Sequence, residues 1–414
     1  MQGAMQGEAG GAAADAAQGV PADAAQGAAR ERVAVDRAPQ LDAACLERVV
    51  VTACTFPTDG PDGEETDGTL AWRATTIVIV ELESGGQRGL GYTYGDVSTA
   101  HFLESKLVPI VLGRDPSDVP SLWHAMFEAI RNAGRPGLGA MAVSAVDVAL
   151  WDLQARRLGM PLFRLLGPFR ERTPVYGSGG FCNYSEARLV EQLTDWVAQG
   201  IPRVKLKTSR DPARDPARLR AVRGALGDGP TLMTDANGAL DRKAGLYWAQ
   251  RFRAEWDVAW LEEPVSSEDR AGLRLIRDQA PPGLEIAAGE YGYVLRDFAD
   301  LLEAGAVDCL QADVTRCGGI TGLRQVAGLC AAHAIDLSAH CAPAVSSHAF
   351  CAVERLRHVE YFHDHVRLEH RLFEGLPTLR DGALVPDPTR PGLGLALAER
   401  AAEPWVVHRR ELRR

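Results

Sequence analysis

Six short apolar segments of this chain each end in a polar residue that can bind a metal ion or transfer a proton. The intervals between these polar residues are 28, 27, 28, 23 and 27 residues. This spacing matches the length of a unit in which a buried strand leads to a helix and then to the next parallel strand. A closed ring of such units brings all strand C-termini to one face, where barrel active sites lie. The pattern therefore predicts an enzyme. In chain order the residues are Lys207, Asp235, Glu262, Glu290, Asp313 and His340.

Three of these residues, Asp235, Glu262 and Glu290, are carboxylates that end successive predicted strands. Carboxylates that converge without a cation repel one another and raise each other's pKa. Oxygen ligands of this charge suit Mg²⁺ or Mn²⁺, which leave coordination positions open for water and substrate. A single acid at a strand end is as often the N-cap of the next helix, but three in register predict a divalent-metal site.

Lys205 and Lys207 lie two residues apart, so on a strand they point to the same face. Lysine is scarce in this chain and occurs only at positions 106, 205, 207 and 243, whereas the rest of the 45 basic residues are arginine. Two neighbouring ammonium groups lower each other's pKa, which makes Lys207 a candidate general base. The ordinary alternative for a lysine at a strand end is a solvated charge or a phosphate contact.

Asp313 and His340 end consecutive predicted strands. A carboxylate within reach of a histidine fixes its tautomer and raises its basicity. A lone histidine is more often structural, but this pairing favours a catalytic His340. In ring order the lysines and His340 flank the metal-binding strands on opposite sides. The pocket would thus hold one base on each face of a metal-bound carboxylate.

The composition is typical of a globular protein that is long enough for two domains. The chain has 414 residues, of which 46% are hydrophobic and 24% are charged, and its formal net charge is −10. This acidic balance argues against a nucleic-acid or anionic-membrane surface. The eight cysteines show no C-x-x-C spacing, which argues against zinc and favours a reducing, cytoplasmic location. No run of 18 apolar residues is present, so we expect no membrane-spanning helix.

The strand-and-helix alternation that begins at Thr173 predicts an α/β chain with a modified (β/α)8 barrel. The preceding segment combines a predicted strand meander with helices, and the polar Pro57–Gly68 loop within it is either disordered or a lid. We predict four segments, which are a disordered Ala/Gly-rich tail at 1–36, an N-terminal α+β domain at 37–168, the barrel at 169–365, and a C-terminal segment at 366–414 that returns to the N-terminal domain.

Nine short motifs occur in a fixed order, weak singly and specific as a set. They are Ala142-x-Ser144-Ala145-x-Asp147-x-Ala149-Leu150-Trp151-Asp152, Leu165-Leu166-Gly167, Lys205-x-Lys207, Asp235-Ala236-Asn237, Leu261-Glu262-Glu263-Pro264, Gly289-Glu290, Gln311-x-Asp313, Gly318-Gly319-Ile320 and His340. With these motifs the chain resembles the enolase superfamily, and within it the mandelate racemase branch of the mandelate racemase/muconate lactonizing enzyme family. The resemblance covers roughly residues 46–400. It implies a barrel under an N-terminal capping domain that the C-terminal segment completes.

The resemblance also implies a role for each site residue. Asp235, Glu262 and Glu290 would hold Mg²⁺, and Glu263 would lie next to these ligands without binding the ion. Lys207 would be one general base, and His340, assisted by Asp313, the other. Lys205 would lower the pKa of Lys207 and contact the substrate carboxylate. Glu360 would donate a hydrogen bond to a carboxylate oxygen of the substrate, and Asn237 and Tyr92 complete the predicted substrate-binding set, with Tyr92 on the capping side.

We expect a magnesium-dependent acid-sugar dehydratase, a carbon–oxygen lyase of the hydro-lyase class in carbohydrate catabolism. Removal of the proton α to a carboxylate builds an enediolate, which needs an adjacent cation. Loss of the β-hydroxyl then gives a 2-keto-3-deoxy sugar acid. A lysine or histidine base beside Mg²⁺ is the established pattern of this superfamily. A polar wall of Tyr92, Tyr94 and the acids at 59, 62, 64, 65 and 67 suits a polyol substrate.

Two alternatives remain open. A racemase or epimerase of 2-hydroxy acids, an isomerase, would use the same two bases without a leaving group. A metal-binding relic without activity is the non-enzyme alternative. Cycloisomerases and amino-acid racemases are disfavoured, because in the family both usually carry a lysine where this chain has Asp313. The family resemblance also implies a homo-oligomer, from dimer to octamer, that binds a small carboxylate and neither nucleic acid nor membrane.

Overall fold

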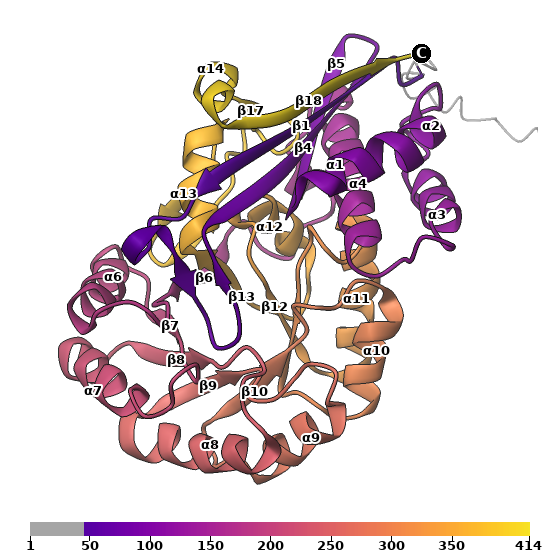
Figure 1. The fold of residues 1–414 in the computed structure, drawn as a ribbon. Coiled ribbons are helices and arrows are strands. Elements are labelled where there is room, and N and C mark those ends of the chain that lie inside the picture. The colour runs from indigo at the N-terminus through magenta and orange to yellow at the C-terminus, as the bar shows by residue number, and fades with distance from the viewer. Residues whose placement is uncertain (1–44) are drawn as a thin grey trace, which may run out of the picture. The chain divides into compact units, whose positions relative to one another are not determined.

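The computed structural model describes residues 45–414, and Figure 1 shows how they are arranged. The tail predicted to be disordered at residues 1–36 lies outside the described residues. Within residues 45–414, eight parallel strands close into a barrel, because β6 pairs with both β7 and β13. A four-stranded sheet with helices lies beside the barrel as a capping domain. The predicted fold class, a modified (β/α)8 barrel with a capping domain, is confirmed.

Each barrel strand is followed by one helix. The strands are β6 (Thr173–Gly179), β7 (Arg203–Lys207), β8 (Thr231–Asp235), β9 (Val258–Glu262), β10 (Glu285–Ala288), β11 (Cys309–Ala312), β12 (Asp336–Ala339) and β13 (Leu356–Phe362). The helices are α6 (Glu186–Ala198), α7 (Asp215–Leu226), α8 (Arg242–Trp256), α9 (Arg270–Gln279), α10 (Leu295–Glu303), α11 (Gly319–His333), α12 (Pro343–Ala349) and α13 (His363–Leu372).

Successive side chains of a barrel strand point alternately toward the helices, where they pack, and into the barrel, where the candidate catalytic residues lie. In β7, Val204 and Leu206 pack into the large core between strands and helices, so Lys205 and Lys207 point the other way, into the barrel. Below the lysines, a smaller apolar cluster fills the barrel interior. It consists of Tyr176, Met233, Trp260, Ala287 and Cys309.

The capping domain is built from both ends of the described chain. Its sheet has the order β18-β1-β4-β5, and the C-terminal strand β18 (Val406–Arg413) pairs antiparallel with β1 (Arg48–Pro57). The other two strands are β4 (Ala74–Ser84) and β5 (Gln87–Gly95), and the helices are α1 (Val97–Phe102), α2 (Val108–Val111), α3 (Val119–Ala129) and α4 (Leu138–Arg157).

Short elements make the remaining connections. They are η1 (Pro61–Gly63), β2 (Glu65–Thr66), β3 (Ala71–Trp72), η2 (Leu103–Leu107), α5 (Leu162–Leu165), η3 (Phe350–Ala352), β14 (Phe373–Glu374), β15 (Thr378–Arg380), β16 (Ala383–Val385), β17 (Ala396–Leu397), α14 (Glu399–Ala402) and η4 (Glu403–Trp405).

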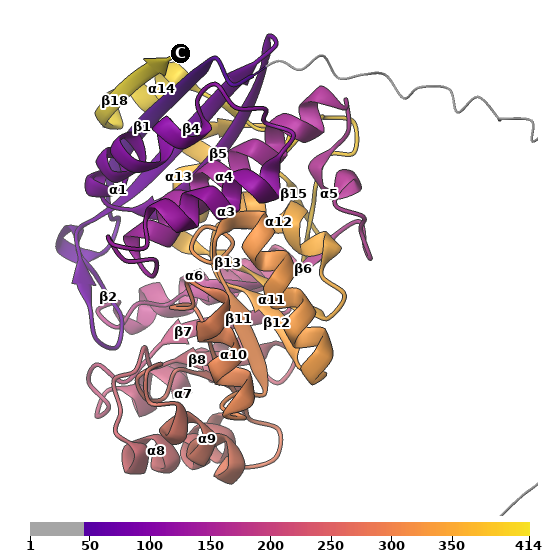
Figure 2. The same ribbon diagram turned by 90° about the vertical axis from the view of Figure 1, so that its right-hand side faces the viewer.

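Helix α4 is the one described helix that is long and apolar enough to span a membrane, but most of it is buried inside the protein. It packs between the capping sheet and α11, as Figure 2 shows. An apolar surface on all sides is typical of a helix that lies inside a protein. Strand β5 approaches α4 closely at Gly91, where a Cβ atom would collide with the carbonyl oxygen of Ala145.

Two side chains of α4 join the capping domain to the N-terminus of α11. Ser144 Oγ accepts from the N–H groups of Gly318 and Gly319, at 2.9 and 3.0 Å. Asp147 accepts from the N–H of Thr321 at 2.9 Å and from its hydroxyl at 2.6 Å. The first N–H groups of a helix have no partner within the helix, and an acid there also meets the positive end of the helix dipole. The Ser-x-x-Asp part of the first motif is therefore structural.

We predict that Asp147→Ala lowers the free energy of unfolding by about 2 kcal/mol, because it leaves buried donors of Thr321 without an acceptor. Asp147→Asn keeps an acceptor at this position, so its free energy of unfolding should fall by about half as much as that of Asp147→Ala, or less. Urea unfolding followed by circular dichroism at one fixed pH measures both. Equal stability of Asp147→Ala and the wild type would contradict the structural role.

Candidate active site

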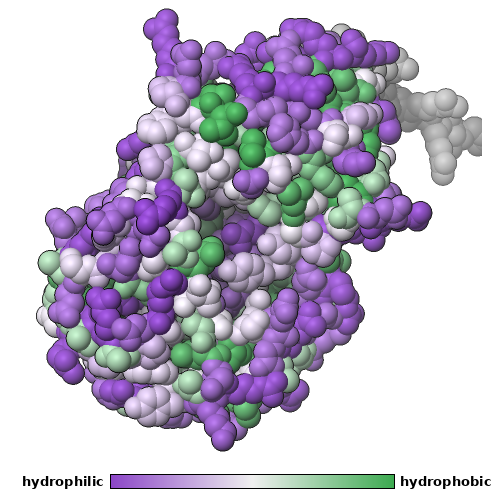
Figure 3. Space-filling model, in the orientation of Figure 1, coloured by the Kyte–Doolittle hydropathy of each residue, from purple (hydrophilic) through white to green (hydrophobic). Residues whose placement is uncertain are grey.

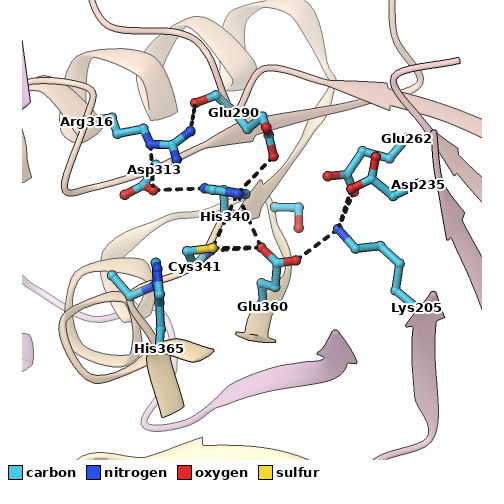
Figure 4. Close-up of polar contacts among 12 residues, drawn as sticks. Lys205, Asp235, Glu262, Glu290, Asp313, Arg316, His340, Cys341, Glu360 and His365 are labelled. Atoms are coloured by element: carbon cyan, nitrogen blue, oxygen red, sulfur yellow. Dashed lines mark hydrogen bonds and ion pairs between the residues drawn. The ribbon is translucent and has the colours of Figure 1, made fainter. Parts of the chain in front are cut away.

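The C-terminal ends of the barrel strands bring the six residues of the repeating pattern into one place. Figure 4 shows most of these residues. Three residues are the last of their strands, and three follow their strands within two residues. The first group is Lys207, Asp235 and Glu262, and the second is Glu290, Asp313 and His340. All six are buried. The side chains point toward a common centre rather than outward, as the closed ring of strands predicts.

Asp235, Glu262 and Glu290 form a cluster in which one carboxylate oxygen of each lies within 4.8 Å of the others. Glu262 Oε1 is buried without a hydrogen-bond partner among residues 45–414. Burial and the nearby Asp235 raise the pKa of Glu262 to about 7. A divalent cation would satisfy the unpaired oxygen and relieve the repulsion, and an all-oxygen donor set suits Mg²⁺. The residues present therefore fit the predicted metal.

Both lysines of β7 lie against this cluster. Lys205 Nζ is 2.6 Å from Glu262 Oε2 and 2.9 Å from Glu360 Oε1. Lys207 Nζ is 2.5 Å from Asp235 Oδ2. Lys205 Nζ also lies 3.6 Å from Asp235 Oδ2 and donates to the Tyr176 hydroxyl at 3.4 Å. Lys207 lies at the edge of the cluster and lines the adjoining cavity.

The pKa of Lys207 is determined by opposing effects. Burial lowers it, but Asp235, together with Glu290 and Glu262, raises it by more, so that it lies above its ordinary value. Lys205 acts in the predicted direction and lowers the pKa of Lys207, yet the carboxylates outweigh it. A divalent cation held by the same carboxylates would weaken their attraction for the Lys207 proton.

His340 is held between two carboxylates. Its Nδ1 lies 2.8 Å from Asp313 Oδ2, and its Nε2 lies 2.9 Å from Glu290 Oε2. Asp313 is itself fixed, because the N–H and the hydroxyl of Thr315 both donate to its Oδ1 at 2.7 Å. Burial lowers the pKa of His340, and Cys341, Glu290 and other nearby acids raise it by more, well above its ordinary value. Asp313 orients the ring so that Nε2 is the nitrogen presented to the site.

Glu360 of β13 lies between Lys205 and His340 in the site. Its Oε1 bonds Lys205, and its Oε2 lies 3.7 Å from His340 Nε2 and accepts from the N–H of Cys341 at 3.0 Å. Burial raises its pKa, but Lys205, His340 and Lys207 lower it by more, well below the ordinary value. The Cys341 thiol lies 3.3 Å from His340 Nε2.

Lys207, Glu290, His340, Cys341 and Glu360 line a cavity of about 340 Å³ between the barrel and the capping domain. Figure 3 shows a hollow on this face with hydrophilic residues in its floor. The volume is near the lower end of the range for small-molecule sites, which suits a small ligand. A larger hollow of about 490 Å³ lies beside Ser266 and Tyr293, but none of the six residues lines it.

The loop between β1 and β4 forms one side of the cavity. Its ends are joined by a 3.0 Å hydrogen bond from the N–H of Thr58 to the carbonyl of Arg73, and the carbonyl of Thr66 accepts from the N–H of Cys182 in the barrel at 2.7 Å. Gly68 touches the backbone of Ala236, where a Cβ atom would not fit. The polar loop that we predicted to be disordered or a lid is therefore ordered against the barrel, and Asp67 lines the cavity.

The structure places the predicted substrate-binding residues unequally. Asn237 and Glu360 line the cavity, and Lys205 lies directly behind Glu360. Tyr92 does not line the cavity, because it is fully buried and donates its hydroxyl to Glu369 at 2.5 Å. Tyr94, two residues further along β5, lines the cavity instead.

Several cavity residues carry no signal in the sequence pattern. Two lie in loops directly after a strand end, and the others lie in strand β3, near the start of α4 or at the start of α13, where neither periodicity nor a motif marks them. A search of the two or three residues after each metal or base residue would have found the first two, and the others come from the capping side or from α13. These residues are Cys341, Arg316, Trp72, Met141, Asp364 and His365.

Two family models match the chain. The model described as "Enolase C-terminal domain-like" matches residues 188–401, and the one described as "Mandelate racemase / muconate lactonizing enzyme, N-terminal domain" matches residues 68–167. The first match covers the barrel from within α6 onward, the second covers the capping domain from the loop before β3 to α5, and β1, β6 and β18 lie outside both.

Three relatives show what the chain is similar to. A solved mandelate racemase/muconate lactonizing enzyme-like protein from Rubrobacter xylanophilus is 57% identical, with a TM-score of 0.85 over 88% of this chain and 100% of that one. The 3,6-anhydro-alpha-L-galactonate cycloisomerase of Streptomyces coelicolor is 34% identical over 78% of this chain and 89% of that protein. The L-talarate/galactarate dehydratase of Salmonella typhimurium is 33% identical over 78% of this chain and 81% of that protein.

A solved structure of the Salmonella dehydratase, liganded with Mg and L-lyxarohydroxamate, aligns with a TM-score of 0.81 over 91% of this chain and 97% of that one, at 29% identity. The prediction of a magnesium cofactor agrees with this relative. The Streptomyces relative is a cycloisomerase, a class that our sequence analysis disfavoured.

We predict that Asp235→Asn lowers the affinity for Mg²⁺ at least about 100-fold, because it removes one charged ligand of three. Isothermal titration of EDTA-treated protein with MgCl₂ measures the affinity. Glu268→Gln is the matched control, since Glu268 is exposed in the loop after β9 and belongs to no carboxylate cluster that the structure describes. Wild-type affinity in Asp235→Asn would refute the assignment of this cluster as the metal site.

Proposed function

The chain belongs to the mandelate racemase/muconate lactonizing enzyme family of the enolase superfamily, and we propose that it is a magnesium-dependent acid-sugar dehydratase. One observation carries the proposal. Lys207 and His340 stand at different edges of the carboxylate cluster, and both line the same cavity. A substrate carboxylate beside the cluster would therefore have a proton-transferring group within reach on either side of its α-carbon.

Asp235, Glu262 and Glu290 would hold the Mg²⁺. When bound, this ion supplies a Lewis acid that takes up the negative charge developing on the substrate carboxylate as the α-proton leaves. On the barrel wall, Lys205 would supply positive charge toward the same carboxylate, whereas Glu360 would donate a hydrogen bond to it only after taking up a proton, because its low pKa keeps it ionised beside Lys205. Glu360 lies at the strand end and lines the cavity, and Lys205 holds it in place through a 2.9 Å ion pair. Side chains fixed before the substrate arrives need no reorganisation during the reaction.

Proton transfer is divided between the two bases. The configuration at C2 decides whether Lys207 or His340 faces the α-proton and removes it. His340 is suited to the second step, because Asp313 holds Nδ1 and leaves Nε2 toward the cavity. A protonated Nε2 can donate to the β-hydroxyl, so that the C–O bond breaks and water leaves. The enol product then rearranges to a 2-keto-3-deoxy acid.

The same residues support a second reaction of the same type. When the β-oxygen belongs to a ring ether, its elimination opens the ring and releases no water, so the product is an isomer of the substrate. The similarity to the Streptomyces cycloisomerase favours this variant as the second candidate. Epimerisation at C2 requires only that the opposite base return the proton.

The cysteines agree with a cytoplasmic location, which we propose as well. All eight lie within the described residues and are free, and seven of them are buried. Unpaired thiols are typical of proteins in a reducing compartment. The homo-oligomer implied by the family resemblance stays a prediction.

The proposal is tested by incubating the purified chain and Mg²⁺ with a library of mono- and diacid sugars and detecting 2-keto acids with semicarbazide. We expect at least one substrate, whose turnover is lost on EDTA treatment and in His340→Asn. If no 2-keto acid forms but deuterium from D₂O enters C2, the enzyme is an epimerase. Absence of both reactions would leave the non-catalytic alternative.

Asp313→Asn should lower kcat about 10- to 100-fold on the substrate found, because an amide at this position disturbs the tautomer and orientation of His340. The effect should fall on kcat rather than on KM, and the pH profile should shift, since Asp313 also acts on the pKa of His340. Steady-state kinetics across pH measure both. Asp278→Asn, an exposed acid at the end of α9, is the control. An unchanged pH profile would argue against a positioning role.

A further inference from the structure

The two sides of the cavity differ in the charges they offer. The barrel side carries the carboxylate cluster and the bases. The other side, which we name the outer wall, is formed by the loop between β1 and β4, by β4, β5 and α4, and by the end of β13 and the start of α13. The outer wall consists of Asp67, Leu70, Trp72, Ala74, Thr75, Thr76, Tyr94, Gly95, Met141, Phe362, Asp364 and His365. A substrate whose first carboxylate lies at the cluster extends its remaining carbons toward this wall.

The charged side chains of the outer wall are two carboxylates. Asp67 Oδ1 accepts from the N–H groups of Thr69 and Leu70 at 2.7 and 2.6 Å, and no described residue donates to its Oδ2. Asp364 accepts from Trp72 Nε1 at 3.4 Å and from the Thr75 hydroxyl at 3.0 Å. These contacts fix both carboxylates toward the cavity as hydrogen-bond acceptors.

No lysine or arginine belongs to the outer wall as the described residues form it. Arg367 donates to Asp364 and Arg210 to backbone carbonyls of the loop, but neither lines the cavity. Arg316 lines the cavity on the barrel side. It is already engaged by Asp313 Oδ2 at 3.5 Å and by the carbonyl of Glu290 at 3.1 Å.

His365 adds a neutral donor. Its Nδ1 accepts from the N–H of Ala342 at 3.2 Å, which places the ring proton on Nε2. Its ring stacks on Tyr94 at a centroid distance of 3.3 Å, which fixes the ring plane. Burial lowers the pKa of His365 to about 3, so the ring carries no charge at neutral pH. No described residue accepts from Nε2, which leaves this N–H for a ligand.

We propose that the outer wall selects a sugar acid with one carboxylate, an aldonate, over a diacid, an aldarate. Hydroxyl groups at the far end of the substrate can donate to Asp67 and Asp364 and accept from His365. A second carboxylate would instead face Asp67 and Asp364, of which Asp364 is paired with Arg367 at 3.1 Å, on a wall whose described residues offer no cation of their own toward the cavity. Such like-charge contacts are an effective means of rejection. This inference rests on the proposed function, because it takes the carboxylate cluster as the place of the first carboxylate.

The test compares pairs that differ only at the last carbon, such as gluconate with glucarate and galactonate with galactarate. Affinities are measured by isothermal titration with Mg²⁺ present and with the Lys207→Ala/His340→Asn double variant, which retains the wall and lacks both bases, so that it should not turn over the ligand. For the pair that binds, the aldonate should bind about tenfold or more tightly than its aldarate. Turnover of the same pairs by the wild type is measured in parallel.

Asp67→Asn and Asp364→Asn, each made in the Lys207→Ala/His340→Asn protein, should reduce this ratio, since an amide keeps the acceptor and removes the charge. Asp62→Asn is the matched control, because Asp62 is exposed on the same loop and does not line the cavity. It should leave the ratio unchanged.

The outcomes separate the two proposals. Turnover of diacids with equal or tighter binding would overturn the selection of aldonates and leave the dehydratase intact. Selective binding of aldonates without any 2-keto acid from the wild type would support the selection and overturn the dehydratase. Failure of every sugar acid to bind would overturn both.

Discussion

Burial of several carboxylates at one face of the barrel is the constraint on which the rest of the site depends. A carboxylate removed from water is costly unless a cation or several donors meet it. Lys205 lies between Glu262 and Glu360, and His340 lies between Asp313 and Glu290. Each cation also has a third carboxylate nearby, Asp235 at 3.6 Å from Lys205 and Glu360 at 3.7 Å from His340, so the charge pairing reaches across the barrel as well as between neighbouring strands. The cluster at Asp235, Glu262 and Glu290 retains more negative charge than the lysines neutralise, which is the condition that a divalent cation meets.

The same constraint shapes the backbone after the strands. Asn237, Glu263 and Cys341 have φ values of 46°, 38° and 51°, a left-handed conformation that side chains other than glycine rarely adopt. Such strain concentrates at functional sites and must be held by its surroundings. The N–H of Asn237 donates to Asp235 at 2.8 Å, and the N–H of Cys341 donates to Glu360 at 3.0 Å. The site carboxylates therefore hold the strained turns as well as the cations.

The sequence was sufficient to predict the features that depend on the spacing of strands and helices and on the residue types at the strand ends. The interval of strand and helix located the barrel strands to within a few residues, and residue type at the strand ends selected the metal and base candidates. The depth of a side chain was not predictable, because Tyr92 and Tyr94 share one face of β5 and lie roughly 7 Å apart along it. Both hydroxyl groups donate to Glu369, at 2.5 and 3.3 Å, yet only Tyr94 lines the cavity. The raised pKa that the protein's side chains give Lys207 before a cation binds could not be predicted, because it depends on distances to three carboxylates that sequence does not fix.

The reacting groups lie at the ends of the barrel strands, whereas most residues of the outer wall belong to the capping domain. The two ends of the described chain pair in the capping sheet. The loop that carries Asp67 connects β1 to β4, and these neighbouring strands are joined along their whole length. The C-terminal strand β18 holds the other edge of β1, and α13, which carries Asp364 and His365, precedes it in the chain. The outer wall is therefore assembled from the capping domain and from the last strand and helix of the barrel. Changes in its capping part can alter which substrate fits without moving a group at the strand ends, because the carboxylate cluster and its cations belong to the barrel.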